Sequence, residues 1–409
     1  MPSSTTKTTQ FKIIFVLYSL LLGLLIGGLA AAFLALINLS THLIWQVGYS
    51  HFNHPAYPLV IGLFGGILVG LMQRSWGPYP KTMHETLSEF KQTGAVAYQH
   101  QVGKNIIAAL VVLACGASLG PEAALSAIVG GLITWLGDRL KLTAHQQTLF
   151  LNMGIGAMLA TIFHAPFAGV GEAIEKTPLR EHFKSHFNQM LLYILTTATG
   201  LLGFTLVNQL FPKESPFALH TPTIHWTLAV WPLLILALIV GFVFGNLFLK
   251  IEQWCQWLAD TIHRPVLLAV IAGICLGACG LLSPYLLFSG EHYLLTFTKS
   301  GLDQSFGYLL LIGLGKTVLT NLIFAFGWRG GKIFPAIFAS AAIGLSLAVL
   351  FPYTPGLLVA TVVAVSCTII VAQPYVTATL LLFLLPLQFF PIILIACIGT
   401  HKIQQLHIK

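Results

Sequence analysis

Two short segments with the same glycine spacing lie in the two halves of this chain. Gly-Ala-Ser-Leu-Gly-Pro-Glu-Ala-Ala occupies residues 116–124, and Gly-Trp-Arg-Gly-Gly-Lys-Ile-Phe-Pro occupies residues 327–335. Each begins with Gly-x3-Gly, lies in an otherwise apolar stretch and precedes a new hydrophobic helix. They begin 211 positions apart in a chain of 409 residues. This spacing predicts a duplicated chain in which both halves carry the same interrupted helix.

The composition predicts an integral, multi-pass membrane protein. Apolar residues make up 56% of the chain and charged residues only 8%, against roughly 25% charged in an ordinary soluble domain. The first apolar run, 13–46, exceeds the roughly 7–15 residues of a secretory signal core, so we expect a membrane helix there. The net charge of +8 comes from residues spread over short loops, so no nucleic-acid partner is expected.

The distribution of basic residues predicts the orientation. The loop 47–57 has no Lys or Arg, whereas the polar loop expected at 74–104 carries Arg74, Lys81, Lys91 and Lys104. Because cytoplasmic loops are enriched in basic residues, we expect a cytoplasmic N-terminus and residence in the cell (inner) membrane.

The apolar segments predict an all-α polytopic fold, an inverted repeat of many tilted and broken helices that meet at a midplane anion site. We expect one membrane domain over 1–409, with an N-terminal half at 12–211 and a C-terminal half at 226–400. The halves match at three places: Gly120 with Gly331, Pro166 with Pro374, and 77–81 with 289–291. The chain ends nine residues after its last apolar segment, so no cytoplasmic regulatory domain is expected.

The two interrupted helices predict an anion site. A helix that starts inside the membrane directs unbonded backbone N–H groups and the positive end of its dipole at whatever lies in front of it. Two such starts, at Gly120-Pro121 and at Gly331-Lys332, would hold a small anion between them. Glu122 is a carboxylate within a membrane helix, which costs roughly 2.5–3.5 kcal/mol and therefore indicates function. Glu122 is predicted to compete with the anion, accept a proton and move aside, although it could instead simply cap its helix.

Several charged residues allow two interpretations. Lys332 adds positive potential to an anion path or extends to the cytoplasmic interface. Lys316 biases the path toward anions or pairs with carbonyl groups. Glu172 and Glu175 lie three apart near a helix end, as a terminal ion pair with Lys176 or as an inner entry for protons. Glu252, beside two tryptophans, is expected to be an interfacial anchor.

These motifs resemble the CLC family of chloride channels and chloride/proton antiporters, over about residues 12–400. Gly-Pro-Glu-Ala-Ala at 120–124 resembles the family's gating-glutamate element, with Glu122 in the glutamate's place, and His-Ala-Pro-Phe-Ala-Gly at 164–169 resembles a helix that ends in acidic residues. The resemblance also implies anion-binding positions, which are Gly120, Pro121, Gly331, Lys332, Ile333, Phe334 and Pro335, and Gly77, Pro78 and Tyr79 in the loop at 76–80.

The chain departs from the family pattern at three places. The loop at 76–80 lacks the family's serine, and Ser75 lies just ahead of it. The family's tyrosine is expected near 386–390, which reads Pro-Leu-Gln-Phe-Phe, and the inner proton-relay glutamate falls at Lys176.

The resemblance implies transport of chloride or a similar small anion through a pore gated by Glu122, with or without coupled proton exchange. The alternatives are an uncoupled anion channel and a fluoride/proton exporter. The chain shows no polar cluster suited to an enzyme, and the cysteines and histidines lack metal-ligand spacing, so no enzyme activity, cofactor or metal is expected. The expected partners are the anion, protons, the lipid bilayer and a second copy of the chain in a homodimer.

Overall fold

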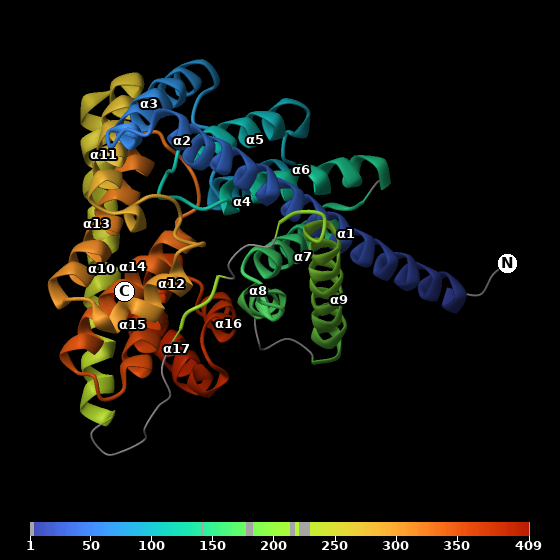
Figure 1. Ribbon diagram of the computed structural model, residues 1–409. Helices are drawn as coiled ribbons and strands as arrows, with labels where there is room; N and C mark the ends of the chain where they lie inside the picture. Colours follow the sequence, from blue (N-terminus) through green and yellow to red (C-terminus); the bar gives the residue numbers. More distant parts are fainter. Residues whose placement is uncertain (1–3, 141, 177–182, 213–216, 221–229, 409) are drawn as a thin grey trace.

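A computed structural model describes residues 4–140, 142–176, 183–212, 217–220 and 230–408 (Figure 1). Regular structure in these residues is helical, without a strand ladder. Part of the segment 212–225, between the two predicted halves, lies outside the described residues. Nine helices in the described part are long and apolar enough to cross a membrane, which confirms the predicted polytopic all-α class.

Each half contributes eight principal helices in the same order. The first-half helices are α1 (Ser4–His42), α3 (Tyr57–Trp76), α4 (Met83–Thr93), α5 (Tyr98–Ala114), α6 (Glu122–Leu140), α7 (Ala144–Ile162), α8 (Ala168–Lys176) and α9 (Phe183–Asn208). The second-half helices are α10 (Val230–Ile262), α11 (Pro265–Leu282), α12 (Leu294–Ser300), α13 (Phe306–Ala325), α14 (Ile333–Leu350), α15 (Pro355–Val371), α16 (Pro374–Leu384) and α17 (Phe390–Ile408).

Short irregular helices complete the described structure. A π-helical turn at Leu43–Gly48 extends α1 into α2 (Tyr49–Phe52), and 3-10 turns lie at Pro284–Leu286, Gly301–Asp303 and Leu387–Phe389. The stretch 74–104, expected as a loop, holds α4 and the start of α5. Helix α4 begins there because Thr82 and Glu85 form a reciprocal capping box, a local signal that the search for apolar segments overlooked.

Left-handed backbone positions recur at matching places in the two halves. Gly116 and Gly327 both have a positive φ, of 86° and 98°. His164 and Ala372 form a second pair, at 51° and 58°. This agreement supports the division at 12–211 and 226–400, which stays a prediction.

Glycines bring α3 and α11 into close contact at the upper left of Figure 1. A Cβ atom on Gly62 would lie 2.1 Å from the carbonyl oxygen of Gly273, and one on Gly273 would lie 2.0 Å from that of Gly62. Glycines spaced four apart on both helices, at positions 62, 66 and 70 and at 273 and 277, thus let the two backbones approach closely. Helices α14 and α15 are buried along most of their length and form the centre of the second half.

Candidate functional site

The two interrupted helices meet at their N-terminal ends. The N–H of Gly120 donates to the carbonyl of Gly331 at 2.8 Å, and the N–H of Gly331 donates back to Gly120 at 2.9 Å. Helix α6 starts at Glu122 and α14 at Ile333, so this two-bond bridge fixes both starts at one place. The positive ends of two helix dipoles therefore act on the same small volume.

The Glu122 side chain occupies that volume. Its residue is 2% exposed, and its Oε1 accepts a hydrogen bond of 2.8 Å from the Ile333 N–H. Its Oε2 is buried and has no hydrogen-bond partner among the residues that the structure describes. A carboxylate thus sits where the start of α14 would bind an anion, and half of its bonding capacity is unused.

The glycines at the bridge make room for this carboxylate. A Cβ atom on Gly331 would lie 1.8 Å from Cδ of Glu122, and one on Gly120 would lie 2.0 Å from Oε2. No side chain fits at either position while Glu122 keeps this conformation, so the glycine requirement here is one of space.

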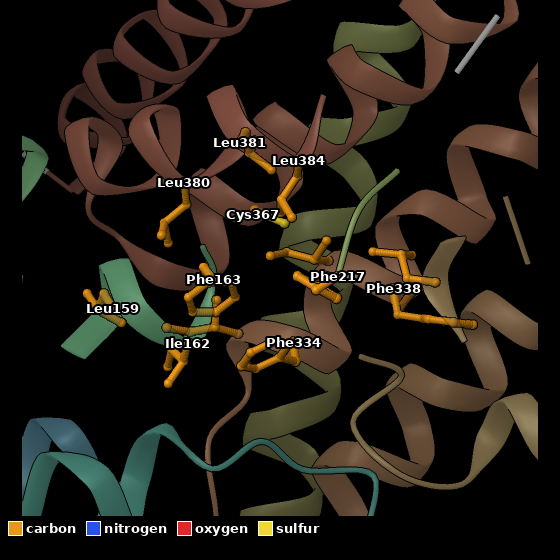
Figure 2. Packing of buried hydrophobic residues seen from close by; sticks show 14 of the residues in the cluster. Leu159, Ile162, Phe163, Phe217, Phe334, Phe338, Cys367, Leu380, Leu381 and Leu384 are labelled. Atoms are coloured by element: carbon orange, nitrogen blue, oxygen red, sulfur yellow. The ribbon is translucent and has the colours of Figure 1, made fainter. Parts of the chain in front are cut away.

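Three phenylalanine rings form an apolar wall beside the bridge (Figure 2). Phe334, next to Ile333, stacks on Phe163 with ring centroids 4.2 Å apart and an interplanar angle of 15°. Phe217 packs against both rings, with centroid distances of 4.7 Å to Phe334 and 5.8 Å to Phe163. The wall keeps one side of the site dry, which strengthens charge interactions within it.

The predicted anion-binding loop at 77–79 has its backbone donors engaged elsewhere. The N–H of Gly77 bonds to the Gln73 carbonyl at 3.0 Å, and that of Tyr79 bonds to the Gly77 carbonyl at 2.8 Å. Pro78 has no N–H. The Gln73 amide holds the loop by donating to the carbonyls of Tyr79 and Gly327. The geometry therefore gives no support to Gly77, Pro78 and Tyr79 as amide donors to an anion.

Arg329 and Lys332, ahead of α14, are both ion-paired. Arg329 pairs with Glu85 and donates from Nε to the carbonyl of Pro80. Lys332 pairs with Glu252 at 2.6 Å and lies 3.8 Å above the Phe324 ring. Glu252, expected to be an interfacial anchor, thus ties α10 to the start of α14.

The two inner acids lie on α8. The Glu175 Oε2 accepts a 3.0 Å bond from the N–H of Tyr375 at the start of α16. Glu172 is 1% exposed and pairs with Lys176 at 3.6 Å, which matches the ion-pair interpretation. Among the described residues, neither acid forms a hydrogen bond with Glu122.

Other predicted features take structural roles. The Ser75 hydroxyl donates to the Leu71 carbonyl within α3, so it does not replace the missing serine. Lys316 is fully buried and donates to carbonyls of residues 285–288, as the carbonyl-pairing interpretation expected. At 386–390, where the resemblance to the family places a tyrosine, the chain forms a 3-10 turn before α17.

Sequence reasoning missed Phe163, Phe217 and Gln73. Phe217 belongs to the polar segment 212–225, which lies between the two predicted halves. A buried aromatic residue in such a segment is the one local signal that could have indicated a tertiary role.

Both the sequence and the fold of this chain match those of known proteins. The profile described as Voltage gated chloride channel matches residues 65–405. The H(+)/Cl(-) exchange transporter ClcA of Salmonella agona (strain SL483) is 30% identical over 260 residues, which are 60% of this chain and 52% of that protein. ClcA of Salmonella paratyphi B matches to the same extent. The chain thus spans about half the length of these curated relatives.

Two solved structures share the fold. A CLC-type fluoride/proton antiporter superposes with a TM-score of 0.75 at 18% identity, over 98% of this chain and 97% of the other. A slow cyanobacterial Cl-/H+ antiporter superposes with a TM-score of 0.73 at 20% identity, over 95% and 93% of the two chains. Since the profile covers most of the sequence and the fold agrees along nearly all of it, this chain belongs to the voltage gated chloride channel (CLC) family.

Proposed function

We propose that this protein moves chloride or a similar small anion across a membrane through a path gated by Glu122, in exchange for protons. One observation carries the proposal: the Glu122 carboxylate accepts the first backbone N–H of α14. A carboxylate and a halide compete for the same kind of donor. The relatives described as H(+)/Cl(-) exchange transporters support the choice of chloride and protons.

Protonation of Glu122 is the proposed opening step. A protonated carboxyl has lost its charge, so its attraction to the helix dipoles and to the Ile333 N–H falls. It then moves out and an anion takes the amide. When the proton leaves on the other side, the carboxylate returns and displaces the anion. Each cycle thus links proton movement to anion movement in the opposite direction.

Glu175 is the proposed inner proton acceptor. Burial raises the pKa of its carboxyl, which favours a proton there at higher pH than for an exposed acid. Glu172 is the second candidate, because burial raises the pKa of its carboxyl although the charge of Lys176 opposes this. If neither acid exchanges protons with Glu122, the same site would work as an uncoupled channel, which is the alternative that Lys176 favours.

Fluoride is the second candidate anion. In the described part of the chain, the carboxylate at the bridge contacts a backbone amide beside phenylalanine rings and no hydroxyl. Ring edges carry partial positive charge, and a small anion of high charge density gains most from them.

We also propose the setting in which this occurs. The protein is expected to lie in the cell membrane with its N-terminus cytoplasmic and to form a homodimer with one path per copy. Exposed leucines on α9, including Leu202 and Leu206, leave an apolar face for lipid or for the second copy.

Paired chloride and proton fluxes from purified protein in liposomes test the proposal, with Glu122→Gln beside the wild type. A chloride gradient should drive protons uphill in the wild type, and the substitution should abolish proton movement, because the amide side chain binds no proton. Glu89→Gln, which removes a half-buried ion pair with Lys81 away from the bridge, is the matched control. Chloride flux without proton movement would support the uncoupled channel. Fluoride flux without chloride flux would identify fluoride, instead of chloride, as the transported anion.

A further inference from the structure

The turn at 289–291 matches the loop at 77–81 in the other half, and it places an acid near Glu122. Gly290 has a φ of 93°, and a Cβ atom there would lie 2.5 Å from the Phe338 ring. Both features require glycine. Its carbonyl accepts the N–H groups of Tyr293 and Leu294, which begins α12 and fixes the direction of Glu291.

A small pocket connects this turn to the start of α6. Its lining includes Pro121, which directly precedes Glu122 in the sequence. It also includes Ser289, Glu291 and His292 from the turn, and Asn38 and Thr41 from the end of α1. Five of its eleven lining residues are polar and six are apolar, so the polar side of the pocket can hold water. Because α1 would begin in the cytoplasm, its far end and the pocket lie on the outer side of the membrane.

Glu291 interacts electrostatically with the gate residue, Glu122. Glu291 is close enough to Glu122 for the two carboxylates to repel each other. Its Oε1 lies 3.4 Å from Nε2 of His292, and the side chains of Glu291 and His292 are 18% and 34% exposed. The pair therefore spans from the pocket surface toward the buried gate.

A buried lysine holds this segment in place. The Lys316 Nζ donates to the carbonyls of Tyr285 and Phe288 at 3.0 and 2.9 Å and lies 4.9 Å from the Phe338 ring centroid. The chain just before Ser289 is thus anchored to α13. The charged or titratable groups around Glu291 are Glu122 on α6, Lys316 on α13, and His292 and Tyr293 in its own turn.

We propose that Glu291 and His292 form an outer proton-exchange site, which passes protons between the external solution and Glu122 through water in this pocket. The proposal rests on Glu122 being a proton-coupled gate. The proton moves from water to the His292 ring or the Glu291 carboxylate, then through water to Glu122, without any covalent change. A proton on Glu291 also removes the repulsion that would otherwise oppose an ionised Glu122.

Titration near neutrality supports this role. Burial raises the pKa of the Glu291 carboxyl to about 7. The group therefore gains a proton in mildly acidic solution and loses it in mildly alkaline solution, the range in which a relay must both accept and donate.

The test is the dependence of proton-coupled flux on external pH in liposomes with one accessible orientation. We expect Glu291→Gln to lower the flux at neutral external pH by roughly tenfold or more, because the relay group is lost. The flux should approach the wild-type value below about pH 5, where protons reach Glu122 directly. His292→Gln should shift the profile in the same direction but less. Asp303→Asn removes an exposed acid beyond α12 and should leave the profile unchanged.

The outcomes separate this inference from the proposed function. If the wild type exchanges anions for protons and Glu291→Gln shows the same pH profile as the wild type, the relay through Glu291 is wrong. The proposed role of Glu122 as the gate is then unaffected. If the wild type moves no anion, the proposed function fails first. Should Glu291→Gln not fold, Glu291→Asp retains a carboxyl and should keep a wild-type-like dependence on external pH, and a flux that loses this dependence would contradict the relay.

Discussion

The most consequential single residue outside the bridge is Phe217, since its ring closes the apolar wall formed with Phe163 and Phe334. Replacing a buried phenylalanine by alanine costs about 3–5 kcal/mol through lost burial and the cavity left behind. We expect Phe217→Ala to lower the melting temperature and to increase chloride leak, because water can then reach the bridge. Thermal unfolding in detergent and flux in liposomes measure both effects. Phe217→Leu, which keeps most of the volume, should retain most of the stability. A Phe217→Ala protein as stable and as tight as wild type would show that the wall has no role.

Residue types were predictable where the reason is local. The glycines and Glu122 stood out because Gly-x3-Gly and an acid in an apolar run are visible in the sequence. The bonding of the donors at 77–79 was not visible, because it depends on a turn that the Gln73 side chain holds against the carbonyl of Gly327, 254 positions away. Contacts between distant segments carry no short-range pattern.

At the scale of elements, ion pairs connect peripheral helices to the starts of the central ones. Glu85 at the start of α4 pairs with Arg329, which precedes α14. Burial tends to raise the pKa of Glu85, but the Arg329 charge and its hydrogen bonds outweigh burial and hold it below 4.5. A lowered carboxyl pKa contributes stability above about pH 4.5 that is lost as the pH falls through the lowered value.

Acid should therefore loosen α4 from the site. We expect the melting temperature of the wild type to fall as the pH drops below about 4.5, and Glu85→Gln to remove part of this dependence. Glu89→Gln breaks the pair between Glu89 of α4 and Lys81, which does not reach α14, and serves as the comparison. An identical pH dependence in wild type and Glu85→Gln would mean that this pair does not tie the two elements.

Helix existence was well predicted because apolar length and glycine spacing are strong signals. The errors occurred where helices are amphipathic or short, as in α4. Its polar capping box and Lys91 led to the expectation of a loop.

At the scale of the whole molecule, the paired halves make each copy self-sufficient, since both helix starts come from one chain. If two copies associate, each should keep its own path. Tagged heterodimers of wild type and Glu122→Gln should therefore show about half the proton-coupled flux of wild-type dimers. Loss of all coupled flux would indicate a shared path, and a monomeric mass in detergent together with full activity would contradict the dimer.

The space between Gly120 and Gly331 has a consequence for control of the gate. Neither glycine has a positive φ, so the backbone at both positions accepts alanine. At Gly331 the atoms that exclude a Cβ atom all belong to the Glu122 side chain, whereas at Gly120 the Phe334 ring, 2.9 Å away, excludes it as well. An added methyl and the inward carboxylate are mutually exclusive. A methyl group at position 331 would therefore keep the Glu122 carboxylate away from the Ile333 N–H permanently and at every pH, whereas a proton on Glu122 does so reversibly.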